Sequence, residues 1–315
     1  MPEAEDFQLA RGKLEQAGHI AAQALAYTCE LVKPKASLLE IVEAGEQRIR
    51  ELGAQPAFPI NISLNHHAAH FTPHLNDSRT LPEQALVKVD LGTHLDGFIA
   101  DTARTVIIGG DERMKQLDDA AKAGLAAAIA TARAGIRVWE VSKAISRAMR
   151  QFGVRPIENL TGHSIEQFTL HAGLSVPSVA NSSDELVSPR LREHMVVAIE
   201  PFATFSSVPR VVDLEPGAIF GFSRKKNPES SKLRSVFSQM KVRYAQLPFA
   251  SRWLAQLVPP ADISALLASL RREGCVQDYP VLGLRDGNFI AQAEHTLIVE
   301  RDGCTVTTLA SEKDG

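Results

Sequence analysis

The sequence has few cysteines, little net charge and no long apolar run, and each absence excludes a class of protein. Its three cysteines, Cys29, Cys275 and Cys304, lie far apart and show no CxxC spacing. Neither a disulfide framework nor a cysteine zinc cluster is therefore expected. The net charge of -3 argues against a general nucleic-acid or membrane binder. No stretch approaches the roughly 20 apolar residues of a membrane span.

The N-terminal stretch MPEAEDFQLARGKLEQ is acidic and polar, where a secretory signal would be basic and then apolar. We therefore expect a cytoplasmic protein with reduced thiols and no membrane anchor. The chain is long enough to bury one large core, because it has 315 residues with 44% hydrophobic content.

Apolar spacing predicts two pairs of helices separated by strands. Ser37 and Glu40 form a capping-box pattern at the start of the second helix, and Gly53 is placed to end it. The predicted helices cover about 7–31, 37–53, 112–134 and 139–152. Short strands follow to about residue 212. This order predicts an α+β domain of two similar halves, although the residues themselves show no clear repeat.

A helical pattern interrupts the strands from Phe222 to about Gly274. The strand pattern resumes with the segment 288–299, so the helical segment is inserted into a β-containing domain. We expect residues 1–221 and 280–315 to form the main domain, and residues 222–279 to form an inserted helical subdomain.

The stretch KVDLGTHLDGFIADTART, residues 88–105, reads as two apolar strands that each carry an aspartate. A two-residue turn at Asp96-Gly97 would set Gly92 opposite Asp101. Because side chains alternate along a strand, Asp90 and Asp101 would then lie on one face, diagonally adjacent. Two carboxylates in such a setting repel each other and lose hydration, and a bound cation would remove both penalties.

Three further residues occupy similarly apolar strand or turn settings: His163, Glu200 and Glu294. Any one of them is more simply explained as a packed or turn residue. Together with Asp90 and Asp101 they make a mainly oxygen donor set. Such a set suits a pair of Mn, Fe, Co or Zn ions about 3.5–4 Å apart.

These residues stand in motifs that resemble type II methionine aminopeptidases of the archaeal kind, a family that shares the pita-bread fold with prolidases and creatinases. The resemblance spans nearly the whole chain. The motifs are FPINISLNHHAAHFTP, VDLGTHLDGFIADTA, TGHSIEQFTLHAG, AIEPFAT and AQAEHTLIVE.

The resemblance implies a pita-bread fold with an inserted helical subdomain and two divalent metal ions per chain, of Co, Mn, Fe or Zn. It implies removal of an N-terminal methionine when the second residue is small. The implied metal ligands are Asp90, Asp101, His163, Glu200 and Glu294, with Asp101 and Glu294 bridging both ions. Glu200 would also be the general base.

Two histidines, His70 and His171, match catalytic positions of the family that contact substrate without binding metal. Phe58, Leu170 and Tyr279 match its methionine pocket, although plain core packing also explains such residues. His66, His67 and His74 have no counterpart. The HHAAH stretch lacks the glutamate of a zinc-protease helix, and Pro73 follows closely.

Two other functions within the same fold fit the sequence less well. Xaa-Pro peptidases resemble this metal set but carry their last two glutamates close together, whereas Glu200 and Glu294 stand 94 positions apart. Non-catalytic pita-bread homologues that bind RNA or protein have lost metal ligands, and all five are present here.

The expected partners are peptide and nascent-protein N-termini, acted on by a monomer with no membrane contact. The ribosome is a further candidate partner, because the segment 224–252 has eight basic residues and one acid, Glu229. A solvated helix face explains the same charges. The basic residues are Arg224, Lys225, Lys226, Lys232, Arg234, Lys241, Arg243 and Arg252.

Overall fold

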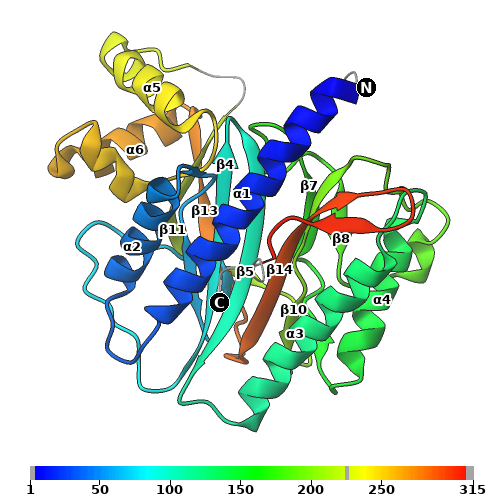
Figure 1. The fold of residues 1–315 in the computed structure, drawn as a ribbon. Coiled ribbons are helices and arrows are strands. Elements are labelled where there is room, and N and C mark those ends of the chain that lie inside the picture. Colours follow the sequence, from blue (N-terminus) through cyan, green and yellow to red (C-terminus); the bar gives the residue numbers. More distant parts are fainter. Residues whose placement is uncertain (1–3, 224–226, 310–315) are drawn as a thin grey trace.

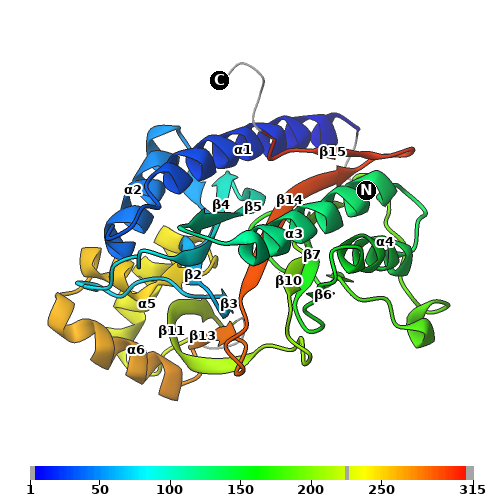
Figure 2. The same cartoon turned by 90° about the horizontal axis from the view of Figure 1, so that it is seen from below.

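Two pairs of helices cover one face of a large mixed-length sheet in the computed structural model, which describes residues 4–223 and 227–309 (Figure 1). The first pair is α1 (Ala4–Glu30) and α2 (Leu38–Glu51), and the second is α3 (Glu112–Thr131) and α4 (Val138–Arg150). Figure 2 shows both pairs on the same side of the strands. The four predicted helices are confirmed, with ends that differ by a few residues.

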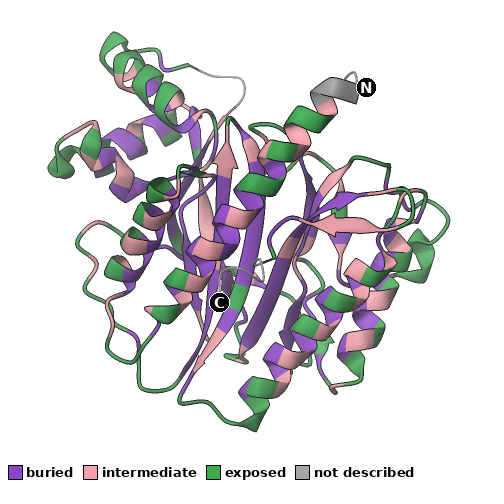
Figure 3. Cartoon of the chain, in the orientation of Figure 1, coloured by how far each residue is buried: buried purple, intermediate pink, exposed green. Residues whose placement is uncertain are grey.

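The central strands of the large sheet are β4 (Ala85–Leu95), β5 (Phe98–Ile108), β14 (Ile290–Val299), β9 (Val196–Ile199) and β7 (Thr161–Ile165), in that spatial order. Shorter strands continue or flank this path: β1 (Gln55–Pro56), β2 (Asn61–Leu64), β6 (Arg155–Pro156), β8 (Ser175–Pro177), β10 (Phe202–Thr204) and β15 (Cys304–Val306). The central strands are buried along most of their length, while the helices alternate buried and exposed faces (Figure 3).

The two helix pairs are equivalent in their packing. The buried residues of α2 are Leu38, Ile41, Val42, Gly45, Glu46 and Ile49, and those of α4 are Val138, Val141, Ser142, Ile145, Ser146 and Met149. Each buried residue of α2 therefore has a buried counterpart 100 positions later. This equivalence confirms the expectation of two similar halves. The repeat lies in which positions are buried, and the side chains at those positions differ.

The β4–β5 hairpin has the register that the sequence predicts. Gly92 pairs with Asp101 in the antiparallel ladder. Asp96 and Gly97 have φ values of 50° and 85°, the left-handed conformation that a tight two-residue turn of this kind needs at both positions. The ladder has no bulge, so Asp90 and Asp101 lie on one face.

A second, four-stranded sheet carries the helical segment. Its strands are β12 (Phe249–Ala250), β11 (Val212–Phe222), β13 (Val276–Gly283) and β3 (His67–Ala69). Helices α5 (Ser231–Tyr244) and α6 (Ile263–Arg272) lie between β11 and β13 in the chain, together with the short 3₁₀ turns η2 (Ser251–Gln256) and η3 (Pro260–Asp262). Another 3₁₀ turn, η1 (Ser182–Asp184), follows β8. The HHAAH stretch, residues 66–70, contains strand β3 and is not a helix.

The strand pattern resumes earlier than the sequence suggested. Strand β13 begins at Val276, whereas the expected resumption was at Asn288. The cause is the composition of β13, VQDYPVLG, in which Asp278 and Pro280 break the apolar alternation of a typical strand. The proposed division at 222–279 therefore follows the helices but cuts through β13. Across the described ranges, no helix has both the length and the apolar character that crossing a membrane requires.

Candidate metal centre

One cavity of about 340 Å³ lies between the large sheet and the four-stranded sheet. It is lined by every residue that the sequence singled out for a site. These are Phe58, His70, Asp90, Asp101, His163, Leu170, His171, Glu200, Tyr279 and Glu294. His66, His67 and His74 do not line it. Residues that lie up to 236 positions apart in the chain, Phe58 and Glu294, are thus brought together by the fold.

Five adjacent strands each supply one metal-binding type of side chain. In spatial order these are Asp90 on β4, Asp101 on β5, Glu294 on β14, Glu200 directly after β9, and His163 on β7. The pairing of the strands places these residues at similar heights along the sheet: Glu294 pairs with Ala103, two residues after Asp101, and His163 pairs with Ala198, two residues before Glu200. The sheet therefore presents four donors from paired strands and the fifth, Glu200, from the residue that follows β9.

The donor atoms are close enough to share an ion. His163 Nε2 lies 3.7 Å from Asp101 Oδ2 and 4.0 Å from Glu200 Oε1. Ligand atoms of Asp101, His163 and Glu294 all lie within 4.8 Å of one another. This spacing, with one nitrogen and several carboxylate oxygens, fits a divalent transition-metal ion.

Burial and mutual repulsion dominate the electrostatics of the cluster. Burial raises the pKa of Asp90 to about 7. Burial, then the charge of Asp90, raises the pKa of Asp101 well above its usual range, and the same two kinds of cause act on Glu200 and Glu294. Burial lowers the pKa of His163 to about 3, so its imidazole is neutral and able to bind metal.

Two buried carboxylate oxygens, Asp90 Oδ1 and Asp101 Oδ1, have no hydrogen-bond partner among the described residues. A buried carboxylate without partners is costly unless a proton or a cation balances it. The residues present therefore fit a bound divalent metal, and a metal ion would satisfy the atoms that the protein leaves unsatisfied.

Gln292 belongs to this cluster, and sequence reasoning missed it. Its Nε2 donates to Asp90 Oδ2 at 3.2 Å and to Glu294 Oε2 at 3.3 Å. The side chain is fully buried. The available signal was strand alternation, because Gln292 precedes Glu294 by two positions on β14 and so shares its face.

The two histidines outside the ligand set occupy the rim of the cluster. The His171 ring lies 4.4 Å from the ring of His163, edge to face. His70 Nδ1 lies 3.1 Å from the carbonyl oxygen of Pro280, and its ring lies 5.4 Å from that of Tyr279. Burial lowers the pKa of His70 to about 4 and also lowers that of His171. Both rings are therefore neutral near pH 7.

The apolar part of the cavity combines walls from both sheets. Phe58 and Leu170 come from loops beside the large sheet, while Ile219, Pro248 and Tyr279 come from the four-stranded sheet and its connections. Gly92 allows the close approach of Phe58, since a Cβ at that position would lie 2.4 Å from the ring. An apolar wall beside a metal-type cluster suits a ligand that has an apolar side chain next to a polar group.

A model of metallopeptidase family M24 matches residues 12–235 of the sequence, about seven-tenths of its length. This chain belongs to family M24. An M24 relative, a methionine aminopeptidase from Pyrococcus horikoshii, is 45% identical over 296 residues, which cover 94% of this chain and 98% of that protein.

Solved structures show the same architecture. A thermophilic Arx1 superposes with a TM-score of 0.81 at 16% identity, covering 95% of this chain and 90% of its own. A methionine aminopeptidase from Thermotoga maritima superposes with a TM-score of 0.68 at 22% identity, and the match covers 94% of this chain and 95% of that one. At these identities the likeness concerns the fold alone. The expected α+β pita-bread fold of the M24 family is confirmed.

Proposed function

We propose that this chain is a metal-dependent methionine aminopeptidase, which removes the N-terminal methionine from peptides and nascent proteins when the second residue is small. The observation that carries the proposal is the convergence of five metal-type donors, two neutral histidines and an apolar pocket on one cavity. The relative from Pyrococcus horikoshii, similar over nearly its whole length, supports the same activity.

Membership of metallopeptidase family M24 implies a divalent metal, and the buried cluster of Asp, His and Glu side chains is suited to hold it. We propose two ions per chain, of Co, Mn, Fe or Zn, held by Asp90, Asp101, His163, Glu200 and Glu294. Asp101 and Glu294, on the adjacent strands β5 and β14, would hold metal at the middle of this set. When bound, the ions would acidify water and polarise the carbonyl of the first peptide bond.

Glu200 is the proposed general base. It lies between Glu294 and His163 in the spatial order of the ligand set, and burial together with the charges of Asp90 and Asp101 raises its pKa well above the usual range. A carboxylate with a raised pKa is a better proton acceptor, so Glu200 can take a proton from the attacking water and later deliver it to the leaving amine.

His70 and His171 are the proposed contacts to the scissile peptide. In neutral His70, Nδ1 must carry the proton to donate to the carbonyl of Pro280, which leaves Nε2 as an acceptor for a peptide N–H. His171 is neutral and can donate to the oxygen that gains charge during attack. Phe58, Leu170 and Tyr279 are the proposed methionine-binding wall.

Release of free methionine from Met-Ala-Ser tests the activity, with N-acetylated Met-Ala-Ser as its control. An aminopeptidase needs the free amino group, so the acetylated peptide should remain intact while the free one is cleaved. Cleavage of both peptides at similar rates would identify a different peptidase. No cleavage of either, in protein loaded with Mn or Co, would overturn the proposal.

We propose a cytoplasmic monomer that acts on N-termini and contacts the ribosome through exposed basic residues of α5. Lys232, Arg234 and Arg243 are exposed and Lys241 is half-buried. Arg224, Lys225 and Lys226 lie outside the described residues. Arg252 was wrongly counted in this group, because its guanidinium is buried and ion-paired with Glu46.

Clustered basic side chains gain affinity for RNA by releasing counterions, so such contact would weaken steeply with salt. Co-sedimentation with ribosomes at low and moderate salt compares the wild type with a Lys232→Glu, Arg234→Glu, Arg243→Glu variant. The variant should sediment less at low salt while peptide turnover is unaltered. Equal sedimentation of variant and wild type at every salt concentration would show that these residues form a solvated helix face and do not bind the ribosome.

A further inference from the structure

Arg252 is one of the most buried charged residues in the chain, at 4% exposed, and its guanidinium is held by three groups. It forms an ion pair with Glu46 of α2, which is 2% exposed. One of its terminal nitrogens donates to Thr72 Oγ1 at 2.8 Å and to the carbonyl oxygen of Pro73 at 3.1 Å. A side chain of the inserted helical segment thus reaches into the main domain.

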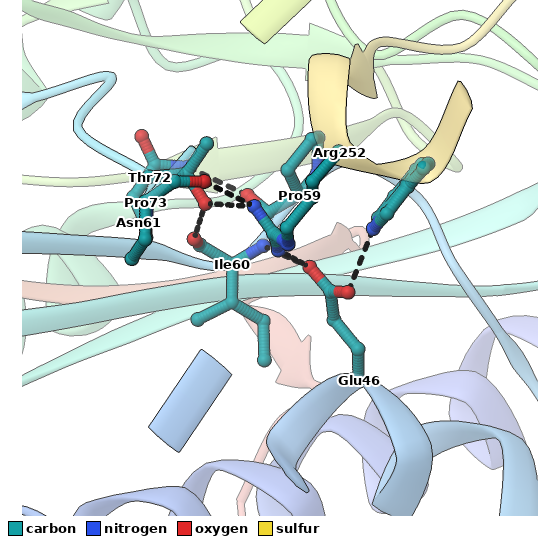
Figure 4. A network of polar contacts seen from close by, with 8 residues as sticks. Glu46, Pro59, Ile60, Asn61, Thr72, Pro73 and Arg252 are labelled. Carbon is teal, nitrogen blue, oxygen red and sulfur yellow. Dashed lines mark hydrogen bonds and ion pairs between the residues drawn. The ribbon is translucent and has the colours of Figure 1, made fainter. Parts of the chain in front are cut away.

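The network converges on the backbone of Ile60 (Figure 4). The N–H of Ile60 donates to Glu46 Oε1 at 3.4 Å, and its carbonyl accepts from Thr72 Oγ1 at 2.8 Å. Glu46 Oε2 accepts from the indole of Trp253 at 2.7 Å. Both polar backbone groups of one residue are therefore bound by side chains that also contact Arg252.

The fixed segment carries the wall of the cavity. Phe58 and Asn61, on either side of Ile60, both line the cavity, and so does His70, two residues before Thr72. The side-chain amide of Asn61 donates to the carbonyl of Pro59 at 3.0 Å, which extends the same set of contacts. Glu46, Thr72 and Arg252 do not themselves line the cavity.

The opposite wall is attached to the same arginine through the chain. Arg252 lies in η2, directly after β12, and β12 pairs with β11 so that Ala250 lies opposite Ile219. Ile219 pairs in turn with Tyr279 of β13. Ile219 and Tyr279 line the cavity from the four-stranded sheet. The ion pair to Glu46 consequently ties one wall of the cavity to the other.

Packing of α2 does not by itself require this charge. The equivalent residue of the second half, Ser146 of α4, is buried in the same way and donates to the carbonyl oxygen of Ser178 at 2.7 Å. Replacement of a buried ion pair by well-matched apolar residues is often neutral or stabilising, so such pairs are weak sources of stability. The glutamate occurs in the half in which the following segment, 58–61, lines the cavity with Phe58 and Asn61.

We propose that Glu46, Arg252 and Thr72 are positioning residues that set the width of the pocket for the first residue of the substrate. This rests on the proposed function, because Phe58 and Tyr279 form that pocket only if methionine occupies the cavity. The inserted segment then acts on specificity from outside the site, by holding the segment from Phe58 to Asn61 at a fixed distance from Ile219 and Tyr279 of the four-stranded sheet.

The test compares Thr72→Val, Thr72→Ser and Arg252→Lys with the wild type. Valine keeps the shape of threonine and removes both hydroxyl contacts, whereas serine keeps the hydroxyl. Lysine keeps the charge opposite Glu46, but its single nitrogen cannot reproduce the forked guanidinium contacts to Thr72 and Pro73 at the same time. Leu270→Ala is the matched control, because Leu270 is fully buried in the core of the insert and does not line the cavity.

The readouts are the KM for Met-Ala-Ser and the ratio of kcat/KM for Met-Ala-Ser to that for Leu-Ala-Ser. Neither depends on the fraction of active enzyme. In Thr72→Val and Arg252→Lys, KM should rise and the ratio should fall, each by about tenfold, the scale on which pocket fit discriminates similar side chains. Thr72→Ser should match the wild type. Leu270→Ala should lower the melting temperature and leave both readouts unchanged.

The proposal is overturned if Thr72→Val and Arg252→Lys melt lower while KM and the ratio stay within about twofold of the wild type. The network would then only stabilise the fold. If Arg252→Lys does not fold, the near-isosteric pair Thr72→Val and Thr72→Ser decides the question. Failure of the proposed function would be seen separately, as a wild type that releases no methionine from Met-Ala-Ser.

Discussion

Asp90 and Asp101 lie diagonally across the β4–β5 ladder, because Gly92 is the residue that faces Asp101. Both side chains point to one face, where burial and their mutual charge raise the pKa of Asp101 well above its usual range. This pair explains why a buried hairpin contains two aspartates. Asp90 Oδ1 and Asp101 Oδ1 have no hydrogen-bond partner in the part of the chain that the structure describes, so both are suited to bind a cation.

Metal-free protein should lose stability as the pH rises. Burial raises the pKa of Asp90 from 3.8 to about 7, so between these values the folded state binds more protons than the unfolded state. Stability from this group is therefore full below about pH 4 and is lost as the pH rises through about 7. Melting curves in chelator, taken across this range, should show a steeper decline for the wild type than for Asp90→Asn.

Added Mn or Co should reverse that decline, because metal binding requires the deprotonated carboxylates and grows stronger as the pH rises. The control is the same titration on Asp90→Asn, which should respond less to metal. A melting temperature that is identical with chelator and with metal near neutral pH would contradict metal binding by this cluster.

Asp101→Ala and His171→Ala should fail in different ways. Removal of a proposed metal ligand should lower the metal content and abolish turnover, whereas loss of His171 should leave the metal bound and lower kcat by about 100-fold or more. Elemental analysis beside steady-state kinetics separates the two. Asp101→Ala protein that keeps its full metal content and substantial activity would show that the ligand assignment is wrong.

Gln292→Met should weaken metal binding without removing a ligand. The amide of Gln292 orients Asp90 and Glu294 by donating to both, and loss of such partners typically costs about 10- to 100-fold in metal affinity. Titration of the metal-free variant, followed by its melting temperature, gives the affinity directly. An affinity equal to that of the wild type would mean that the strands alone orient the two carboxylates.

The second residue of the substrate should matter as much as the first. The cavity is small, at about 340 Å³, and its donor cluster occupies one side. Met-Ala and Met-Gly peptides should therefore be cleaved far faster than Met-Leu or Met-Arg peptides, by about 100-fold in kcat/KM. Equal rates for Met-Ala and Met-Arg would indicate a broader aminopeptidase.

The sequence predicted the hairpin well because short-range rules determine it. The turn at Asp96-Gly97 sets the register, and the register places Asp90 relative to Asp101 without any knowledge of the rest of the fold. The helix pairs follow equally from apolar spacing. The convergence of His163, Glu200 and Glu294 on the same cavity depends on strand order. Their residue types and apolar settings suggested one donor set, and resemblance to a known family assigned it as a metal site.

Long-range contacts explain the errors. Arg252 stands in the most basic stretch of the sequence, and nothing local distinguishes it from its exposed neighbours. Its burial depends on distant partners, among them Glu46, 206 positions away, and Thr72, 180 positions away. Gln292 was overlooked because a single amide carries no motif. Strand β13 was placed late because Asp278 and Pro280 conceal a strand that pairing with β11 stabilises.

The most direct test of the central claim is release of the first residue from Met-Ala-Ser and Leu-Ala-Ser, with metal analysis of the same protein sample. Methionine release should require bound divalent metal, stop in chelator, return on adding Mn or Co, and exceed leucine release by at least about tenfold. Equal release of methionine and leucine, or methionine release by protein that contains no metal, would contradict a metal-dependent methionine aminopeptidase.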